Sequence, residues 1–132
     1  MSVNPSRSMA EEIAHMLQSI GPVSVTRFFG GAGLSLDGTQ FGFVIKGALY
    51  LRVNDVTRDK YEALGCRPFS YATRTKHVTV SSYYEAPADA VDDPSELCDW
   101  AAEAHLAATK ANEHKRPPSQ ARAKGFAKKK VS

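Results

Sequence analysis

The stretch GLSLDGTQFGFVIKGALYLRV, residues Gly33–Val53, decides the fold of this 132-residue chain. Two dipeptides, Asp37-Gly38 and Lys46-Gly47, separate runs in which apolar side chains alternate with others. An Asp-Gly pair between alternating runs is a strong hairpin signal, because both residues tolerate positive φ in a tight turn. The stretch therefore predicts antiparallel strands near residues 33–37, 40–46 and 48–53, and the β-branched segment before it adds a strand near 23–28.

A second hairpin is expected downstream. The segments PFSYAT (68–73) and HVTVSSYY (77–84) are rich in aromatic and β-branched residues and flank a short polar turn. Strands that are grouped in hairpins, with helices outside the groups, favour an α+β fold with an antiparallel sheet.

Helices are predicted before, between and after these strand groups. Ser8 and Glu11 have the spacing of a capping box, and apolar residues follow at helical spacing as far as Ile20. A short helix is expected over residues 57–64, with Gly65 just beyond its end.

The last helix is predicted to begin at Pro94, with Asp93 as its capping residue. Its small and apolar residues recur at helical spacing, which favours close packing on a sheet; they are Leu97, Ala101, Ala104 and Ala108. We expect a folded domain over residues 8–110 and a basic, disordered tail over 111–132.

Composition is ordinary for a soluble globular protein, with 42% hydrophobic and 23% charged residues. The sequence has no apolar run of the ~20 residues that span a bilayer, and no signal-peptide pattern at its start. We therefore expect a cytoplasmic protein without a membrane partner. The two cysteines form no CxxC pair and the four histidines are scattered, so no metal site is expected.

Charge is distributed unevenly along the chain. Residues 1–109 carry nine Lys and Arg against 13 Asp and Glu. Residues 110–132 carry eight Lys and Arg against one acidic residue. Such a tail is either a solvated low-complexity segment or a nucleic-acid contact, in which an aromatic ring among the cations would add base stacking. The candidate nucleic-acid contacts are Arg122, Lys124, Phe126, Lys128, Lys129 and Lys130.

The glycine cluster RFFGGAG, residues 27–33, raises the question of phosphate chemistry. A dinucleotide fingerprint fails because Leu36 stands at the third glycine position and a strand follows. A P-loop fails because it lacks the lysine, and no GxSxG accompanies an oxyanion loop. We interpret the cluster as a structural turn or close backbone approach between two strands. No catalytic residue, cofactor or metal is expected.

Aromatic residues supply the other candidates. Tyr83 and Tyr84 lie next to each other in a predicted strand, so one is expected in the core and the other half-exposed. Tyrosine is also enriched at protein interfaces. The candidate partner contacts are therefore Arg27, Phe29, Tyr83 and Tyr84.

Several of these motifs, in order, resemble the N-terminal domain of the TfoX/Sxy family. They are FGG at residues 29–31, GL at 33–34, DG at 37–38, LYL at 49–51, PF at 68–69, YY at 83–84 and Pro87, and the resemblance spans residues 9–108. It implies a secretion-chaperone-like domain in the order α-β3-α-β2-α, with no catalytic residues and no cofactor.

The resemblance also implies a function. Characterised members are positive regulators of competence genes and act with the cyclic-AMP receptor protein. Full-length members carry a C-terminal helical domain, and a basic tail stands in that place here.

Three functional hypotheses follow. The first is a non-catalytic regulatory domain that binds a protein, such as a transcription factor. The alternative is a nonspecific nucleic-acid-binding accessory protein that contacts DNA through its tail. The third hypothesis is an enzyme, which would require a cleft in which carboxylate or histidine side chains have strongly shifted pKa values. A homodimer is a further expectation, because secretion-chaperone-like domains often pair and sheet edges need protection.

Overall fold

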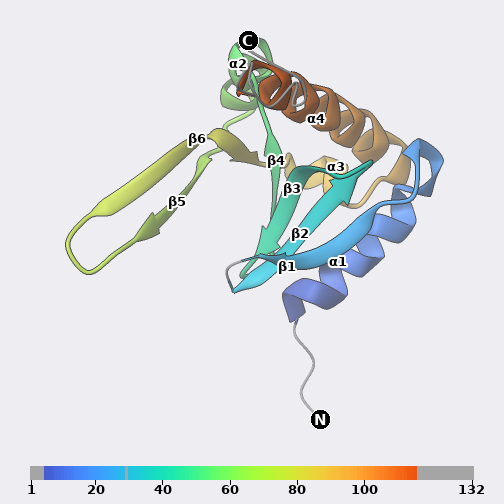
Figure 1. The fold of residues 1–132 in the computed structure, drawn as a ribbon, viewed down its shortest axis with the longest axis horizontal. Helices are drawn as coiled ribbons and strands as arrows, with labels where there is room; N and C mark the ends of the chain where they lie inside the picture. Colours follow the sequence, from blue (N-terminus) through green and yellow to red (C-terminus); the bar gives the residue numbers. More distant parts are fainter. Residues whose placement is uncertain (1–4, 29, 116–132) are drawn as a thin grey trace, which may run out of the picture.

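The computed structural model of the chain describes residues 5–28 and 30–115 (Figure 1). The described helices are α1 (Pro5–Met16), the 3-10 helix η1 (Gln18–Ile20), α2 (Asp55–Ala63), α3 (Ala88–Val91) and α4 (Pro94–Lys115). The described strands are β1 (Ser24–Phe28), β2 (Gly31–Leu36), β3 (Thr39–Ile45), β4 (Ala48–Arg52), β5 (Pro68–Ala72) and β6 (His77–Glu85).

All six strands form one antiparallel sheet in the order β1-β2-β3-β4-β6-β5. The α+β class is confirmed. Four strands precede α2, as the residue pattern predicts. The order implied by the family resemblance has only three strands there, so it is wrong by one strand. The first of these four strands, β1, pairs with β2 from Ser24↔Ser35 to Phe28↔Gly31. The short helix α3 is a further addition to the expected order.

The two hairpin turns are confirmed. Asp37 and Gly38 have φ of 53° and 80°, and Lys46 and Gly47 have the same pair of values. Two consecutive positive φ angles define a type I′ turn, whose twist matches that of the flanking strands. Local turn chemistry therefore sets the register of β2 on β3 and of β3 on β4.

Helix boundaries differ from the sequence prediction at the N-terminus of the chain. Helix α1 begins at Pro5, so Ser8 lies within it and is not its cap. Proline suits the first helical turn, because a backbone N–H at that position would have no intrahelical partner, so nothing is lost when proline lacks it. Helix α4 continues to Lys115, beyond the expected domain end at residue 110.

Side chains cap the N-termini of both α2 and α4 by accepting hydrogen bonds from backbone N–H groups of the first helical turn. The Asn54 side chain accepts from Val56 N–H and Thr57 N–H, and thereby starts α2 two residues earlier than predicted. Gly65 follows α2 with φ of 81°, which confirms its role after the helix end. The Asp93 carboxylate accepts from Ser95 N–H and Glu96 N–H at the start of α4, as predicted.

The main core lies between the sheet and the pair α1 and α4. The predicted alanine stripe of α4 is buried against β3 and β4, which confirms the close approach of this helix to the sheet. The largest fully buried aliphatic side chains in this layer are Leu17, Leu34, Leu51, Leu97 and Val44. Burial of a leucine of this kind contributes about 2 kcal/mol.

A bulge changes which side of the sheet two phenylalanines face. The pairing of β2 with β3 shifts after Leu34, which pairs with Gly42, while Ser35 pairs with Gln40. The extra residue is Phe41, which joins the helix-side core, whereas Phe43 lies outside that cluster on the opposite face. Simple alternation would have placed both rings on one face.

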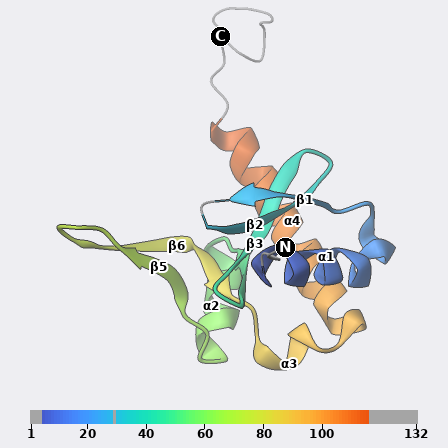
Figure 2. The same ribbon diagram turned by 90° about the horizontal axis from the view of Figure 1, so that it is seen from below.

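The hairpin formed by β5 and β6 projects from the body of the domain. β4 pairs with β6 only over Tyr50↔Glu85 to Arg52↔Tyr83, and the remainder of β6 pairs with β5 alone. Figures 1 and 2 both show this hairpin extending away from α1 and α4. None of the helices in the described ranges combines the length and apolar composition that a membrane span requires.

Candidate functional site

Six aromatic side chains lie on the side of the sheet that α1 and α4 leave uncovered. We call this set the aromatic face; it comprises Phe28, Phe43, Tyr50, Phe69, Tyr71 and Tyr83. The rings come from five strands, β1, β3, β4, β5 and β6. None of the six belongs to the helix-side core cluster.

Phe43 is the centre of the aromatic face. Its ring stacks on Phe28 with centroids 4.5 Å apart and on Tyr50 at 5.4 Å. Phe69 meets it edge-on at 5.0 Å, and Tyr83 is tilted against it at 4.8 Å. These neighbours leave Phe43 only 1% exposed, so the inner part of the aromatic face is a small second core.

The outer rings of the aromatic face remain accessible. Tyr71 lies 5.8 Å from Phe69 and is 42% exposed. Tyr83 is half-buried, and the Arg52 guanidinium lies 5.6 Å from its ring centroid. Exposed tyrosine supported by a rigid ring cluster offers contact area at low cost in side-chain entropy.

The glycine cluster allows backbones to approach each other beside the aromatic face. A Cβ on Gly31 would lie 1.9 Å from Val44 O, and one on Gly33 would lie 2.8 Å from Gln40 Oε1. Neither residue adopts a left-handed φ, so the cluster serves close approach rather than unusual backbone angles. The structural interpretation of RFFGGAG is confirmed.

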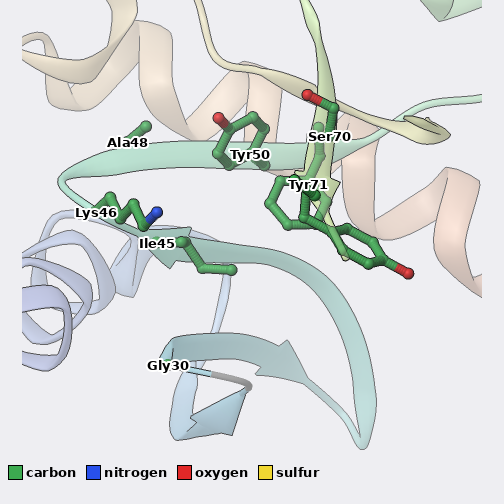
Figure 3. Close-up of a pocket in the computed structure, with 9 residues that line it drawn as sticks. Gly30, Ile45, Lys46, Ala48, Tyr50, Ser70 and Tyr71 are labelled. Atoms are coloured by element: carbon green, nitrogen blue, oxygen red, sulfur yellow. The ribbon is translucent and has the colours of Figure 1, made fainter. Parts of the chain in front are cut away.

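A groove of about 590 Å³ adjoins the exposed end of the aromatic face. One wall is β5, and the other is formed by the β3–β4 turn and the β1–β2 turn. Figure 3 shows Ser70 and Tyr71 on β5 at the right, across from the turn that carries Lys46 at the left, with Gly30 below. The groove lining is Gly30, Ile45, Lys46, Ala48, Tyr50, Phe69, Ser70, Tyr71 and Ala72.

Charge divides the domain into two sides. The strand-bearing segments, residues 22–53 and 66–85, carry six Lys and Arg against two acids, Asp37 and Glu85. The helical segments, residues 5–20, 54–65 and 86–111, carry four Lys and Arg against 11 Asp and Glu. Between described residues, the ion pairs Arg7–Glu11, Arg58–Asp55 and Lys60–Glu103 all join residues of helices. The strand-bearing segments are therefore basic, and the helical segments are acidic.

Two titratable groups, Tyr50 in the groove and Cys66 beside the helix-side core, favour their neutral forms. Burial, and secondarily the charge of Glu85, raises the pKa of Tyr50. The same two causes raise the pKa of the Cys66 thiol, so at neutral pH it stays protonated and is a poor nucleophile. Among the side chains that the structure describes, within residues 5–28 and 30–111, no three His, Cys, Asp or Glu cluster as metal ligands would.

A comparison with protein-family models assigns the chain. The TfoX N-terminal domain model matches residues 15–108. The chain belongs to the TfoX N-terminal domain family. The matched range contains the whole aromatic face and all nine residues of the groove. A search of curated proteins returned no match to the chain.

In this TfoX N-terminal domain, the candidate partner contacts from the sequence do not form one site. Tyr84 was predicted as a contact, and this is wrong: it is 3% exposed and donates a hydrogen bond to Glu62. Alternation along β6 explains the difference, because Tyr84 pairs with Leu51 on the core side while Tyr83 faces away. Tyr83 does lie on the aromatic face.

The other sequence candidates are placed differently. Arg27 is exposed on the edge strand β1 and neighbours Phe28, so it points to the opposite side of the sheet from the aromatic face. Phe29 lies outside the described residues, and so do the six tail residues from Arg122 to Lys130.

Sequence reasoning missed Phe43, Phe69 and Tyr71 as site residues of the TfoX N-terminal domain. Their strands are far apart in the chain, and the bulge at Phe41 hides the outward direction of Phe43. One local signal was available: β5, PFSYA, combines two aromatic rings with no charge, which is unusual for a strand in a projecting hairpin.

Proposed function

We propose that this chain is a non-catalytic regulatory domain that binds a protein partner through its aromatic face. The single observation that carries the proposal is a cluster of six aromatic rings on a sheet face that no described helix covers. Aromatic residues are enriched at protein interfaces, and exposed aromatic patches mark interaction sites. Family membership supports a role of the competence-regulator type, with a transcription factor as the partner class.

The chemistry of the groove supports binding rather than catalysis. Its lining has one cation, Lys46, and the hydroxyls of Tyr50, Tyr71 and Ser70, with no carboxylate, histidine or thiol among the lining residues. A general acid–base or nucleophilic mechanism requires such a group within hydrogen-bond reach of the substrate. The groove instead offers apolar walls and a few polar anchors, which suits a bound side chain.

Site-specific photo-crosslinking in cells tests the proposal. A benzophenone amino acid replaces Tyr71 on the aromatic face, and a matched variant carries it at the exposed Asp99 on α4. We expect a discrete adduct from the Tyr71 position that protease removes and nuclease leaves intact, and no comparable adduct from the Asp99 position.

Three results would contradict the proposal. They are equal adducts from both positions, no adduct from the Tyr71 position, and an adduct that nuclease removes. The last result would favour the nucleic-acid alternative, and mass spectrometry of a protein adduct would identify the partner.

A further inference from the structure

Strand β5 is an edge of the sheet whose protection, Pro68 and a register shift between Pro68 and Phe69, is confined to its start. It is the last strand in the sheet order, and its residues, Pro68–Ala72, include no charge. Natural edge strands are normally protected by charged residues, bulges or a covering element, because an open edge pairs with other chains. Pro68 blocks pairing only at the first position of β5.

The backbone groups of β5 that point outward follow from its pairing with β6. Thr73 N–H donates to Lys76 O at 2.7 Å, so this pair is a hydrogen-bonded one. Hydrogen-bonded and non-hydrogen-bonded pairs alternate along an antiparallel ladder. The pairs Ala72↔His77 and Ser70↔Thr79 are therefore non-hydrogen-bonded, and the N–H and C=O groups of Ser70 and Ala72 point to the open edge.

This open edge borders the groove. Four consecutive residues of β5, from Phe69 to Ala72, line it, although successive side chains of a strand point to opposite faces. A groove lined by consecutive residues therefore runs along the edge of the strand. An extended chain paired with Ser70 and Ala72 would direct alternate side chains toward Tyr50 and Ile45, which also line the groove (Figure 3).

One cation lines the groove, and two more lie at the hairpin tip, just beyond the last groove residue of β5, Ala72. Lys46 lines it, and Arg74 and Lys76 lie at the tip of the β5–β6 hairpin. Among the described residues, the side chains of these three cations make no hydrogen bond or ion pair. Unpaired cations beside an apolar groove favour an anionic occupant through electrostatic complementarity.

We propose that the β5 edge and its groove bind an extended, acidic segment of a partner protein by adding it to the sheet as a further strand. This inference rests on the proposed function and names the chemistry of its partner. Main-chain hydrogen bonds to Ser70 and Ala72 give affinity, and alternate side chains in the groove give specificity. Acidic residues at the ends of the segment pair with Lys46 and with Arg74 or Lys76.

Charge disfavours the occupants that the chain itself could provide. Residues 116–132 include six Lys and Arg and no Asp or Glu, so they are repelled by the basic groove. A second copy docked groove to groove would bring Lys46, Arg74 and Lys76 against the same cations.

A single-stranded nucleic acid fits the cations, but of the aromatic face only the outer rings, such as Tyr71, are open for stacking. Base stacking requires open ring faces. Phe43 and Phe69 are 1% and 7% exposed, and both faces of Phe43 are covered by Phe28 and Tyr50. The open backbone edge of β5 also suits a peptide, which alone can form a β ladder.

Selection from a library of random dodecapeptides tests the inference. The baits are the full chain, the variant Lys46→Glu/Arg74→Glu, and the control Lys110→Glu, whose exposed charge lies on α4. We expect the native chain and the control to enrich acidic peptides with alternating apolar residues. The double variant should enrich basic peptides, because its groove carries the opposite charge.

The edge pairing is tested with one enriched peptide. Ser70→Pro removes an outward N–H, and we expect it to weaken binding at least about tenfold. Ser70→Ala keeps that N–H and loses only the hydroxyl, so we expect it to weaken binding by less than about threefold. Circular dichroism checks that each variant is folded. Equal affinity for the proline and alanine variants would overturn the strand addition.

Other outcomes would overturn the rest of the inference. These are no enrichment, enrichment without an acidic bias, the same selection by the double variant, or tighter binding of oligothymidylate in the groove. A protein crosslink from the Tyr71 position would leave the proposed function standing in each of these cases, so the two failures are distinguishable.

Discussion

Tyr84 donates a hydrogen bond of 2.5 Å to Glu62 Oε2, which joins β6 to α2 across the edge of the core. The preceding residue, Tyr83, lies 4.8 Å from Phe43 on the other side of the sheet. One step along β6 therefore separates a structural tyrosine from a surface one. The two tyrosines should respond differently to substitution.

We predict that Tyr84→Phe lowers the free energy of unfolding by about 1.5 kcal/mol at about pH 8, because it removes a hydrogen bond to a charged acceptor. That hydrogen bond, and secondarily burial, raises the pKa of Tyr84 above its ordinary value of 10.0. A raised pKa means that the native state favours the protonated hydroxyl, so the stabilisation is present below pH 10 and declines above it.

Urea unfolding of both proteins at about pH 8 and about pH 11 measures this effect. The stability gap between wild type and Tyr84→Phe should narrow at the higher pH. A gap that stays constant or widens would show that the hydroxyl does not stabilise the fold through this hydrogen bond.

Gly31→Ala and Gly30→Ala form a matched pair within the glycine cluster. A Cβ on Gly31 meets Val44 O at 1.9 Å, whereas a Cβ on Gly30 has nothing within 4 Å. We predict that Gly31→Ala costs about 3 kcal/mol because the backbones of β2 and β3 must move apart. Gly30→Ala should stay within about 0.5 kcal/mol of wild type. Equal losses in urea unfolding would refute the close-approach role of Gly31.

Phe43 and Tyr71 belong to the same aromatic face but differ in exposure, at 1% and 42%. We predict that Phe43→Ala lowers stability by about 4 kcal/mol, because it leaves a cavity beneath four rings. Tyr71→Ala should cost less than about 1 kcal/mol. Trp100, the one tryptophan of the chain, reports unfolding by fluorescence. A large loss from Tyr71→Ala would mean that Tyr71 stabilises the fold and is not chiefly a contact residue.

The basic tail gives a separate prediction about nucleic acid. If residues 116–132 contact about five phosphates of duplex DNA, the logarithm of the binding constant falls against that of salt concentration with a slope near −4.5. Deletion of these residues should abolish binding, because the described domain is acidic overall. Fluorescence anisotropy at several salt concentrations measures the slope. Binding that survives the deletion would assign it to the folded domain.

Much of the fold could be predicted from local sequence. Asp37-Gly38 specifies a type I′ turn by its own chemistry, and the stripe from Leu97 to Ala108 specifies which side of α4 is buried. The start of α1 was less predictable, because Ser8 and Glu11 fit a capping box although the helix begins at Pro5. Competing local signals near a chain end do not reveal which of them forms the boundary.

The aromatic face depends on contacts that sequence alone does not provide. Phe28, Phe43 and Phe69 lie on strands far apart in the chain, and a bulge decides which way Phe43 points. Tyr83 and Tyr84 could be assigned to opposite faces, but the direction of each depended on where α2 and α4 pack. The candidate site therefore emerged from the sheet order and from helix placement rather than from any motif.

The central claim is that the aromatic face is the partner-binding surface. Its most direct test is the affinity of the partner identified by crosslinking, measured by titration calorimetry for wild type, Tyr71→Ser and Leu106→Ser. Leu106 is 56% exposed on α4 and serves as a matched apolar control on the helical side. We predict that Tyr71→Ser weakens binding at least about tenfold while Leu106→Ser leaves it unchanged. Unchanged affinity for Tyr71→Ser, or a loss confined to Leu106→Ser, would contradict the claim.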